Sequence, residues 1–262
     1  MEKRPYILTI AGFDPSGGAG ITADVKTMEA LKGYGLAVCT ANTVQTDILF
    51  DACFWTDIEV IKNQIKILFD RFEINFVKIG IIQNLEVLAE VIDFVLVKNN
   101  NVKIVLDPVL NASSDFDFQK SGIISEDTSM DSEKLNHQLD EILKKIYLLT
   151  PNYQEIEKLY MDKTIADTIS HIKSKTNLLL KGGHRTDCRG VDVLFTKEGK
   201  KFEINPETSK ITEKHGSGCI LSSAITVQLA MGFSLPKACL RGKLYTEKVL
   251  SSTTDLLGYH NI

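Results

Sequence analysis

The 262-residue sequence has no long apolar run and no cluster of positive charge. No segment approaches the roughly 20 apolar residues that span a bilayer. The apolar stretch near the start is short and is broken by Gly12 and Asp14, so we do not interpret it as a signal peptide. Lys and Arg number 30 against 34 Asp and Glu, a net charge of −4. Neither nucleic acid nor a membrane surface is therefore an expected partner.

Closely spaced cysteines are also missing. The five cysteines are scattered, with no CxxC spacing, at positions 39, 53, 188, 219 and 239. An odd, dispersed set of this kind does not suit a disulfide framework or a structural zinc site. It fits a reducing compartment, and we expect a cytoplasmic protein. Internal repeats and low-complexity linkers are absent as well.

Short apolar runs alternate with amphipathic segments along the chain. We predict strands at 6–11, 36–44, 76–79, 102–106, 147–149 and 178–180, and a hairpin around 197–200. We predict helices at 21–31, 58–68, 85–96, 135–146, 165–172, 220–231 and 236–250. Apolar strands that each precede an amphipathic helix favour a mostly parallel sheet covered on both faces. The polar stretch at 111–131 is long for a loop and is interpreted as an insertion.

Two glycine-rich turns each precede a predicted helix. The first, Gly12–Gly20, follows the first strand, and the second is Gly216–Gly218. Unpaired N–H groups and the positive end of the dipole make the start of a helix a good anion site. The first turn is no Walker A loop, because no Gly-Lys-Ser/Thr closes it. The two turns together suggest a nucleotide phosphate at one and a substrate at the other.

Six motifs then occur in order along the chain. They are AGFDPSGGAGITADVKT (11–27), VKIGII (77–82), LDPVL (106–110), LLTPNYQEIEKL (148–159), LLLKGGH (178–184) and HGSGCILSSA (215–224). Together they closely resemble the hydroxymethylpyrimidine/phosphomethylpyrimidine kinases of thiamin biosynthesis, in the ribokinase-like superfamily. The resemblance extends from Tyr6 to about Lys248.

This resemblance implies a fold and a reaction. The fold is a three-layer α/β/α sandwich with a mostly parallel central sheet, in a single domain over residues 1–262. The reaction transfers the γ-phosphate of ATP to the hydroxymethyl group of 4-amino-5-hydroxymethyl-2-methylpyrimidine, an aminopyrimidine alcohol, and then to the resulting monophosphate. Mg²⁺ would assist it.

The resemblance also implies a catalytic role for the second glycine turn. The amides of Gly216, Ser217 and Gly218 would hold the transferring phosphoryl oxygens. Cys219 would accept the hydroxyl proton, since a thiol at a helix N-terminus should have a lowered pKa. The alternative is a small buried cysteine that only packs the first helical turn. The flanking glycines favour function here, and we accept the packing role for the other four cysteines.

Other sites follow from the same resemblance. ATP-binding residues would be Lys181, Gly183, Thr212 and His215. Magnesium would be placed by Asp107, Asn152 and Glu155. Each metal assignment has a plainer alternative, because Asn152 and Glu155 have the spacing of a helix capping box and Asp107 suits a turn.

The aminopyrimidine would be recognised by Gly12, Asp24 and Gln45. A carboxylate can accept from the exocyclic amine, and a carboxamide can both donate and accept. Asp24 could instead serve only the helix dipole, and Gln45 could be an ordinary polar residue at a strand end.

Three other functions stay open. The first is a pyridoxal or pyridoxine kinase of the same branch, because Phe13 and Thr22 replace the family's usual serine and glutamine. The second is a Rossmann-type nicotinamide dehydrogenase on the weak Gly18–Ala23 pattern, which lacks an acidic residue after the second strand. The third is a nonenzymatic regulator. A homodimer is possible, and the sequence does not fix the oligomeric state or any monovalent cation.

Overall fold

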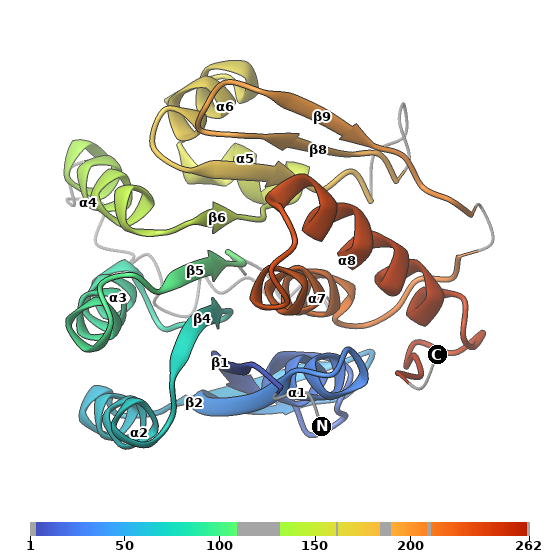
Figure 1. The fold of residues 1–262 in the computed structure, drawn as a ribbon, viewed down its shortest axis with the longest axis horizontal. Helices are drawn as coiled ribbons and strands as arrows, with labels where there is room; N and C mark the ends of the chain where they lie inside the picture. Colours follow the sequence, from blue (N-terminus) through green and yellow to red (C-terminus); the bar gives the residue numbers. More distant parts are fainter. Residues whose placement is uncertain (1–3, 109–131, 161, 184–189, 209–210, 261–262) are drawn as a thin grey trace.

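The computed structural model describes residues 4–108, 132–160, 162–183, 190–208 and 211–260. In this part of the chain, nine strands form one sheet in the order β3-β2-β1-β4-β5-β6-β7-β8-β9 (Figure 1). Neighbouring strands from β2 to β7 run parallel. Strand β3 is antiparallel to β2, β8 is antiparallel to β7, and β9 is antiparallel to β8. The strands are β1 (Tyr6–Phe13), β2 (Tyr34–Gln45), β3 (Phe50–Trp55), β4 (Ile74–Ile79), β5 (Lys103–Leu106), β6 (Leu148–Leu149), β7 (Asn177–Leu180), β8 (Asp192–Phe195) and β9 (Lys201–Ile204).

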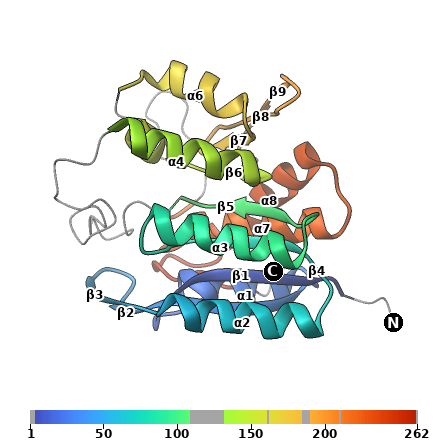
Figure 2. The ribbon, with the colours of Figure 1, turned by 90° about the vertical axis from the view of Figure 1, so that its left-hand side faces the viewer.

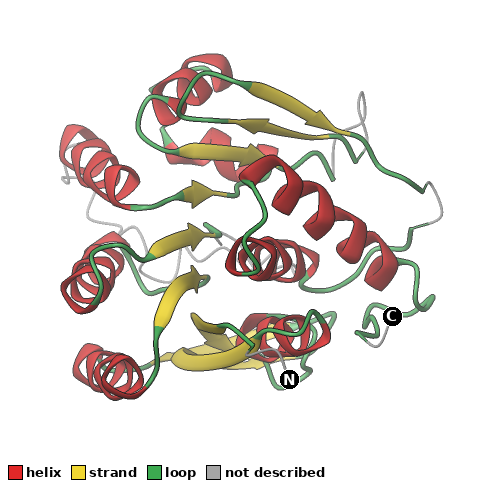
Figure 3. Ribbon diagram, in the orientation of Figure 1, coloured by secondary structure: helices red, strands yellow, loops and turns green. Residues whose placement is uncertain are grey.

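Helices cover the sheet on both sides. Helices α1, α7 and α8 lie on one face and α2 to α6 on the other, as Figures 1 and 3 show from the front and Figure 2 from the side. This arrangement confirms the predicted three-layer sandwich. The helices are α1 (Gly20–Ala30), α2 (Ile58–Arg71), α3 (Leu85–Lys98), α4 (Ser132–Lys145), α5 (Tyr153–Leu159), α6 (Ile165–Lys173), α7 (Ser217–Ala230) and α8 (Leu235–Leu250).

The continuous apolar runs are explained by burial on both faces. On β1, Leu8 and Ile10 belong to the core under α2 to α6, while Ile7 packs with Met28 and Val227 on the opposite face. Successive residues of a strand point to opposite faces, so a central strand between two helical layers must be apolar throughout.

The edge strand β3 and the short helix α5 were not predicted. Along β3 only Phe50 is buried, so the strand has neither a continuous apolar run nor a clean alternation to reveal it. The insertion expected at 111–131 and the cysteine at 188 lie outside the described residues. Among the residues that are described, no helix is long and apolar enough to cross a membrane.

The sheet topology creates a switch point beside β1. Helix α1 leads from β1 to β2 on one face, whereas α2 leads on to β4 on the other, so the connections diverge at β1. Ligands of such sheets bind in the crevice outside the carboxyl ends of the strands. Gly12, Gly80, Asp107 and Lys181 lie at or just beyond the carboxyl ends of β1, β4, β5 and β7.

Candidate active site

The two glycine turns contact each other directly. Gly216, the residue before α7, has φ 74°. A Cβ placed there would lie 2.1 Å from the carbonyl oxygen of Gly18 and 2.7 Å from Cα of Ala19. Only glycine suits this left-handed backbone and leaves room for the first turn. Segments about two hundred residues apart in sequence therefore share one wall.

A buried hydrogen bond between Asp14 and His215 holds the turns together. Asp14 accepts hydrogen bonds from Nε2 of His215 at 3.0 Å, from N of Ala19 at 2.8 Å and from both N and Oγ of Ser16. Burial raises the pKa of Asp14, but the hydrogen bonds from His215, Ser16 and Ala19 outweigh it and lower the pKa overall. The side chain of His215 is buried and joins the two loops, and its predicted role at the nucleotide stays a prediction.

The hydroxyl of Thr212 makes hydrogen bonds within the protein. Its hydroxyl lies 2.8 Å from the carbonyl of Leu250 and 2.9 Å from that of Thr253, and it accepts from Lys214. The side chain therefore anchors the end of α8. The predicted role of Thr212 at the nucleotide stays a prediction.

Cys219 lies in the first turn of α7 and is partly exposed. Burial raises the pKa of its thiol to about 11; the Lys78 charge lowers the pKa, and Asp24 and Asp107 raise it. The predicted lowering of the pKa is therefore wrong for the protein without ligands. The helix terminus does favour a thiolate, but desolvation and two buried carboxylates oppose it more strongly.

This pKa has a direct consequence for thiol reactivity. Only the thiolate attacks an alkylating agent, so the rate at Cys219 should follow the thiolate fraction. We expect the iodoacetamide rate to rise about tenfold per pH unit from about pH 7 to about pH 10. Peptide mass spectrometry of the modified Cys219 measures it, and a plateau below about pH 9 would contradict the raised pKa.

Asp107, Glu155 and Lys181 form a buried charge cluster next to α7. The ammonium of Lys181 lies 2.8 Å from Oδ1 of Asp107 and 3.6 Å from Oε2 of Glu155. Burial raises the pKa of both acids, but Lys181 and Lys78 outweigh it at Asp107, whose pKa is lowered. At Glu155 burial, with the Asp107 charge, outweighs Lys181, and the pKa is raised. Lys181 thus lies between two neighbouring carboxylates whose pKa values are shifted in opposite directions.

The cluster faces the second glycine turn. A Cβ on Gly218 would lie 3.3 Å from Nζ of Lys181 and 3.6 Å from Oδ2 of Asp107. The first N–H groups of a helix have no acceptor within the helix. The start of α7 therefore brings the N–H of Gly218 to the same place as a lysine, while the N–H of Ser217 donates to the carbonyl of Lys214 at 3.4 Å. This combination is suited to an anion with several oxygens.

Asn152 and Glu155 form the capping box that their spacing allows. Oδ1 of Asn152 accepts from N of Glu155 at 2.8 Å, and Oε2 of Glu155 accepts from N of Asn152 at 2.7 Å. The structural alternative is therefore confirmed, and the metal role stays a prediction. No group of three or more His, Cys, Asp or Glu that could hold a metal ion occurs in the described part of the chain.

Asp24 is corrected as a substrate-binding residue. It has no exposed surface, and its carboxylate accepts from Thr9 at 2.5 Å, Ser223 at 2.6 Å and Lys78 at 2.8 Å. These bonds lie below the site, between the sheet and helices α1 and α7. The residue that the sequence analysis missed is Lys78. A lysine inside the apolar strand Ile74–Ile79 was the available signal.

The remaining predicted residues lie at strand ends. Gly12 is buried near the end of β1, where a Cβ would meet Cγ2 of Ile81 at 2.9 Å. Gln45 is the last, half-buried residue of the neighbouring strand β2. Gly183 follows Lys181 and is exposed, with no atom within 4 Å of a Cβ built on it.

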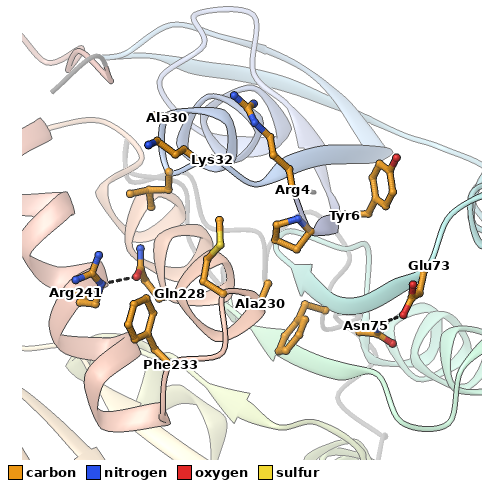
Figure 4. A pocket seen from close by; sticks show the side chains of 14 residues that line it. Arg4, Tyr6, Ala30, Lys32, Glu73, Asn75, Gln228, Ala230, Phe233 and Arg241 are labelled. Carbon is orange, nitrogen blue, oxygen red and sulfur yellow. Dashed lines mark hydrogen bonds between the residues drawn. The ribbon is translucent and has the colours of Figure 1, made fainter. Parts of the chain in front are cut away.

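A cavity of about 1080 Å³ lies at the other end of the strands (Figure 4). Residues around the amino ends of β1 and β4 and the end of α7 line it, among them Tyr6, Asn75, Gln228 and Arg241. Arg241 donates to Oε1 of Gln228 at 2.6 Å and covers the ring of Phe233. Because it faces away from the carboxyl ends of the strands, this cavity is not where the glycine turns meet.

Comparison with known proteins places these features in a family. A family model described as phosphomethylpyrimidine kinase matches residues 14–261. The hydroxymethylpyrimidine/phosphomethylpyrimidine kinase of Aquifex aeolicus is 33% identical over 259 residues, covering 95% of both chains. The crystal structure of a Clostridium difficile phosphomethylpyrimidine kinase matches with a TM-score of 0.72 and 31% identity, covering 93% of this chain and 98% of that one.

Two further results set the limits of the likeness. A Staphylococcus aureus pyridoxal kinase solved with AMP-PCP and pyridoxal has a TM-score of 0.79 over 99% of this chain and 94% of that one. At 21% identity, it shows the fold alone. The chain also spans only 46% to 55% of the length of four longer curated relatives. The fold is ribokinase-like, and the chain belongs to the phosphomethylpyrimidine kinase family, whose members are kinases.

Proposed function

We propose that this chain transfers the γ-phosphate of ATP to 4-amino-5-hydroxymethyl-2-methylpyrimidine and then to its monophosphate. The observation that carries the proposal is the contact between the two glycine turns. It brings the start of α7 and Cys219 together with the carboxyl ends of β1, β4, β5 and β7, where Lys181 and Asp107 lie. A pathway role in thiamin biosynthesis, a cytoplasmic location and a homodimer belong to the same proposal.

In this reaction the protein mainly holds charged and hydrogen-bonding groups next to the phosphoryl group and the alcohol. Phosphoryl transfer requires donors for the equatorial oxygens and a group that takes the hydroxyl proton. The N–H groups of Ser217 and Gly218 would bind the transferring phosphoryl group, and Lys181 would neutralise its charge. Cys219, in the next position of α7, would accept the proton as the alcohol oxygen bonds to phosphorus. The thiolate needed for this is scarce in the free protein, where the pKa of Cys219 is raised to about 11.

A magnesium ion fits the donors that are present. Asp107 supplies a buried carboxylate with a lowered pKa. The carboxylate of Glu155 lies near the same Lys181 ammonium that contacts Asp107. Mg²⁺ prefers such oxygen ligands and usually keeps several waters and phosphate oxygens, so it does not need a cage of three side chains. Asp107 and Glu155 would hold the ion with its waters, and Asn152 would keep Glu155 in place through the capping box. The ion would supply charge neutralisation at the phosphates.

The substrate would lie between the ends of β1 and β2. Gln45 can both donate to and accept from an aminopyrimidine, and Gly12 lets the ring approach the backbone. Phe13 is 39% exposed next to Gly12, and its ring is available to stack on a flat heterocycle. Asp24 is not part of this contact, because its side chain is fully buried below the site.

Product analysis tests the proposal. The purified chain is incubated with ATP and Mg²⁺ and with hydroxymethylpyrimidine, its monophosphate or pyridoxine, and products are identified by ³¹P NMR and mass spectrometry. We expect the pyrimidine monophosphate and then the diphosphate, with more than about 100-fold loss when EDTA removes the metal. The Cys219→Ala variant is the negative control. Phosphorylation of pyridoxine alone, or only free phosphate from ATP, would overturn the proposed substrate.

A further inference from the structure

An ion pair is buried directly below the candidate active site. The side chains of Lys78, on β4, and Asp24, on α1, are both 0% exposed, and Nζ lies 2.8 Å from Oδ2. Burying an ammonium and a carboxylate costs several kcal/mol each, and packed apolar residues are often at least as stable. Stability alone therefore does not explain why this pair is present. Its position directly below the site suggests a role in the function of the site.

Asp24 does not use all the donors of Lys78. Its Oδ1 accepts from Ser223 and its Oδ2 from Thr9, in addition to the ammonium. An ammonium has three N–H donors, and the carboxylate takes one of them. Asp24 also accepts from two neutral hydroxyls and fixes the ammonium, whose charge acts on Cys219 and Asp107 as well.

Glycine at position 80 shows where the ammonium lies. A Cβ at Gly80 would be 2.8 Å from Nζ of Lys78 and 3.1 Å from Cβ of Ala11. Gly80 and Ala11 are at the carboxyl ends of β4 and β1, where the first glycine turn begins. The ammonium therefore occupies the space that a side chain at 80 would need, just below the floor of the site.

Cys219, in the first turn of α7, is a reactive group on which the Lys78 charge acts. Ser223, which bonds Asp24, lies four residues after Cys219 on α7, so the two share a helix face. The charged groups around the thiol are Lys78 on β4, Asp24 on α1, Asp107 after β5 and Lys181 after β7. Lys78 exerts the largest charge effect that lowers the thiol pKa, and the two acids oppose it.

We propose that Lys78 is a positioning residue of the phosphotransfer reaction, whose ammonium stabilises negative charge on the sulfur of Cys219. The thiolate then takes the proton of the substrate hydroxyl while the oxygen bonds to the γ-phosphorus and the bond to ADP breaks. The inference rests on the proposed function for its role in catalysis. Its effect on the sulfur can be measured without any substrate.

The test removes the pair as a unit, because loss of Lys78 alone would leave Asp24 charged and unpaired. In Lys78→Met/Asp24→Asn, the amide oxygen can still accept from the hydroxyls of Thr9 and Ser223. Because Asp24 itself raises the thiol pKa, the reference is Asp24→Asn, which keeps the ammonium. We expect iodoacetamide to modify Cys219 of the double variant about tenfold more slowly than Cys219 of Asp24→Asn at pH 9, equivalent to one unit of thiol pKa. Cys39 and Cys53, which are also partly exposed, serve as references in the same digest.

A matched control removes another buried pair. Lys243 lies 2.9 Å from Asp192 and 3.7 Å from Glu247, and all three are nearly buried. In Lys243→Met/Asp192→Asn/Glu247→Gln we expect the alkylation rate of Cys219 to stay within about threefold of the original. Equal rates at Cys219 in folded Lys78→Met/Asp24→Asn and Asp24→Asn, or a tenfold loss in the control, would overturn the proposal.

Kinetics separate positioning from binding. In Lys78→Met/Asp24→Asn we expect kcat to lie at least about tenfold below that of Asp24→Asn, with KM for ATP and the pyrimidine changed by less than about threefold. If circular dichroism shows this variant unfolded, Gly80→Ala replaces it, since its methyl group meets Nζ and displaces the ammonium. The same losses are expected there, and normal kcat and alkylation would refute the proposal. Should the unaltered protein phosphorylate no alcohol, the proposed function fails while the alkylation result still decides the effect on sulfur.

Discussion

Replacement of Cys219 by alanine is expected to lower kcat by about 10²–10⁴-fold, the usual contribution of a group that accepts a proton in the transition state. The side chain lies in the first turn of α7, beside the N–H groups that we assign to the phosphoryl group. Alanine keeps these donors and the helix, and it removes the hydrogen bond between the sulfur and the backbone of Gly20 in the first glycine turn. Steady-state phosphorylation of hydroxymethylpyrimidine measures the loss, and the melting temperature should change by only a few degrees.

Cys53→Ala provides the matched control. This thiol is also partly exposed and burial raises its pKa to about 11, but it lies on the edge strand β3. We expect its removal to leave kcat within about twofold, since surface substitutions away from special features have small effects. Near-normal turnover of Cys219→Ala would exclude the thiol as the proton acceptor.

Replacement of Gly216 by alanine is expected to separate the two glycine turns. The residue has φ 74°, and the new methyl group would lie 2.1 Å from the carbonyl oxygen of Gly18. The left-handed backbone costs roughly 1–2 kcal/mol for alanine, and overpacking against another backbone typically adds about 1–3 kcal/mol. Because neither backbone can rotate away like a side chain, we expect kcat/KM to fall more than about 100-fold.

The backbone strain can be separated from the collision. Gly232 has φ 85° at the end of α7, and no atom lies within 4 Å of a Cβ built there. Gly232→Ala should therefore carry only the backbone cost of about 1–2 kcal/mol. We expect a small drop in melting temperature and nearly normal activity. Equal losses in the two variants would show that contact between the turns is unimportant for function.

Most of the fold could be predicted because the central strands are buried on both faces. Their continuous apolar runs, as in Ile7, Leu8 and Ile10, need only local sequence to be recognised. The β8–β9 hairpin was confirmed as well, because two short strand-like runs flank the turn at 197–200. The edge strand β3 was missed, because pairing on one side and partial exposure remove the pattern.

The location of the candidate site could be predicted from the sequence, but the partners of its side chains could not. Asp107 and Lys181 follow buried strands, and parallel strands bring such ends together at one edge. His215 and Asp24 were assigned to ligands, and the structure instead pairs them with Asp14 and Lys78. These partners are distant in sequence, so no local pattern indicates that the side chains are already engaged.

The sequence alone determined the family, the parallel sheet and the two turns that need glycine, because each depends on local periodicity or on an ordered set of short motifs. Tertiary structure decided which of the polar residues are buried and what each one pairs with. Cys219 illustrates the difference. Its place at a helix start follows from neighbouring residues, whereas its pKa of about 11 depends on burial and on charges from three other segments. Desolvation and Coulomb interactions act through space, so only the packed chain defines them.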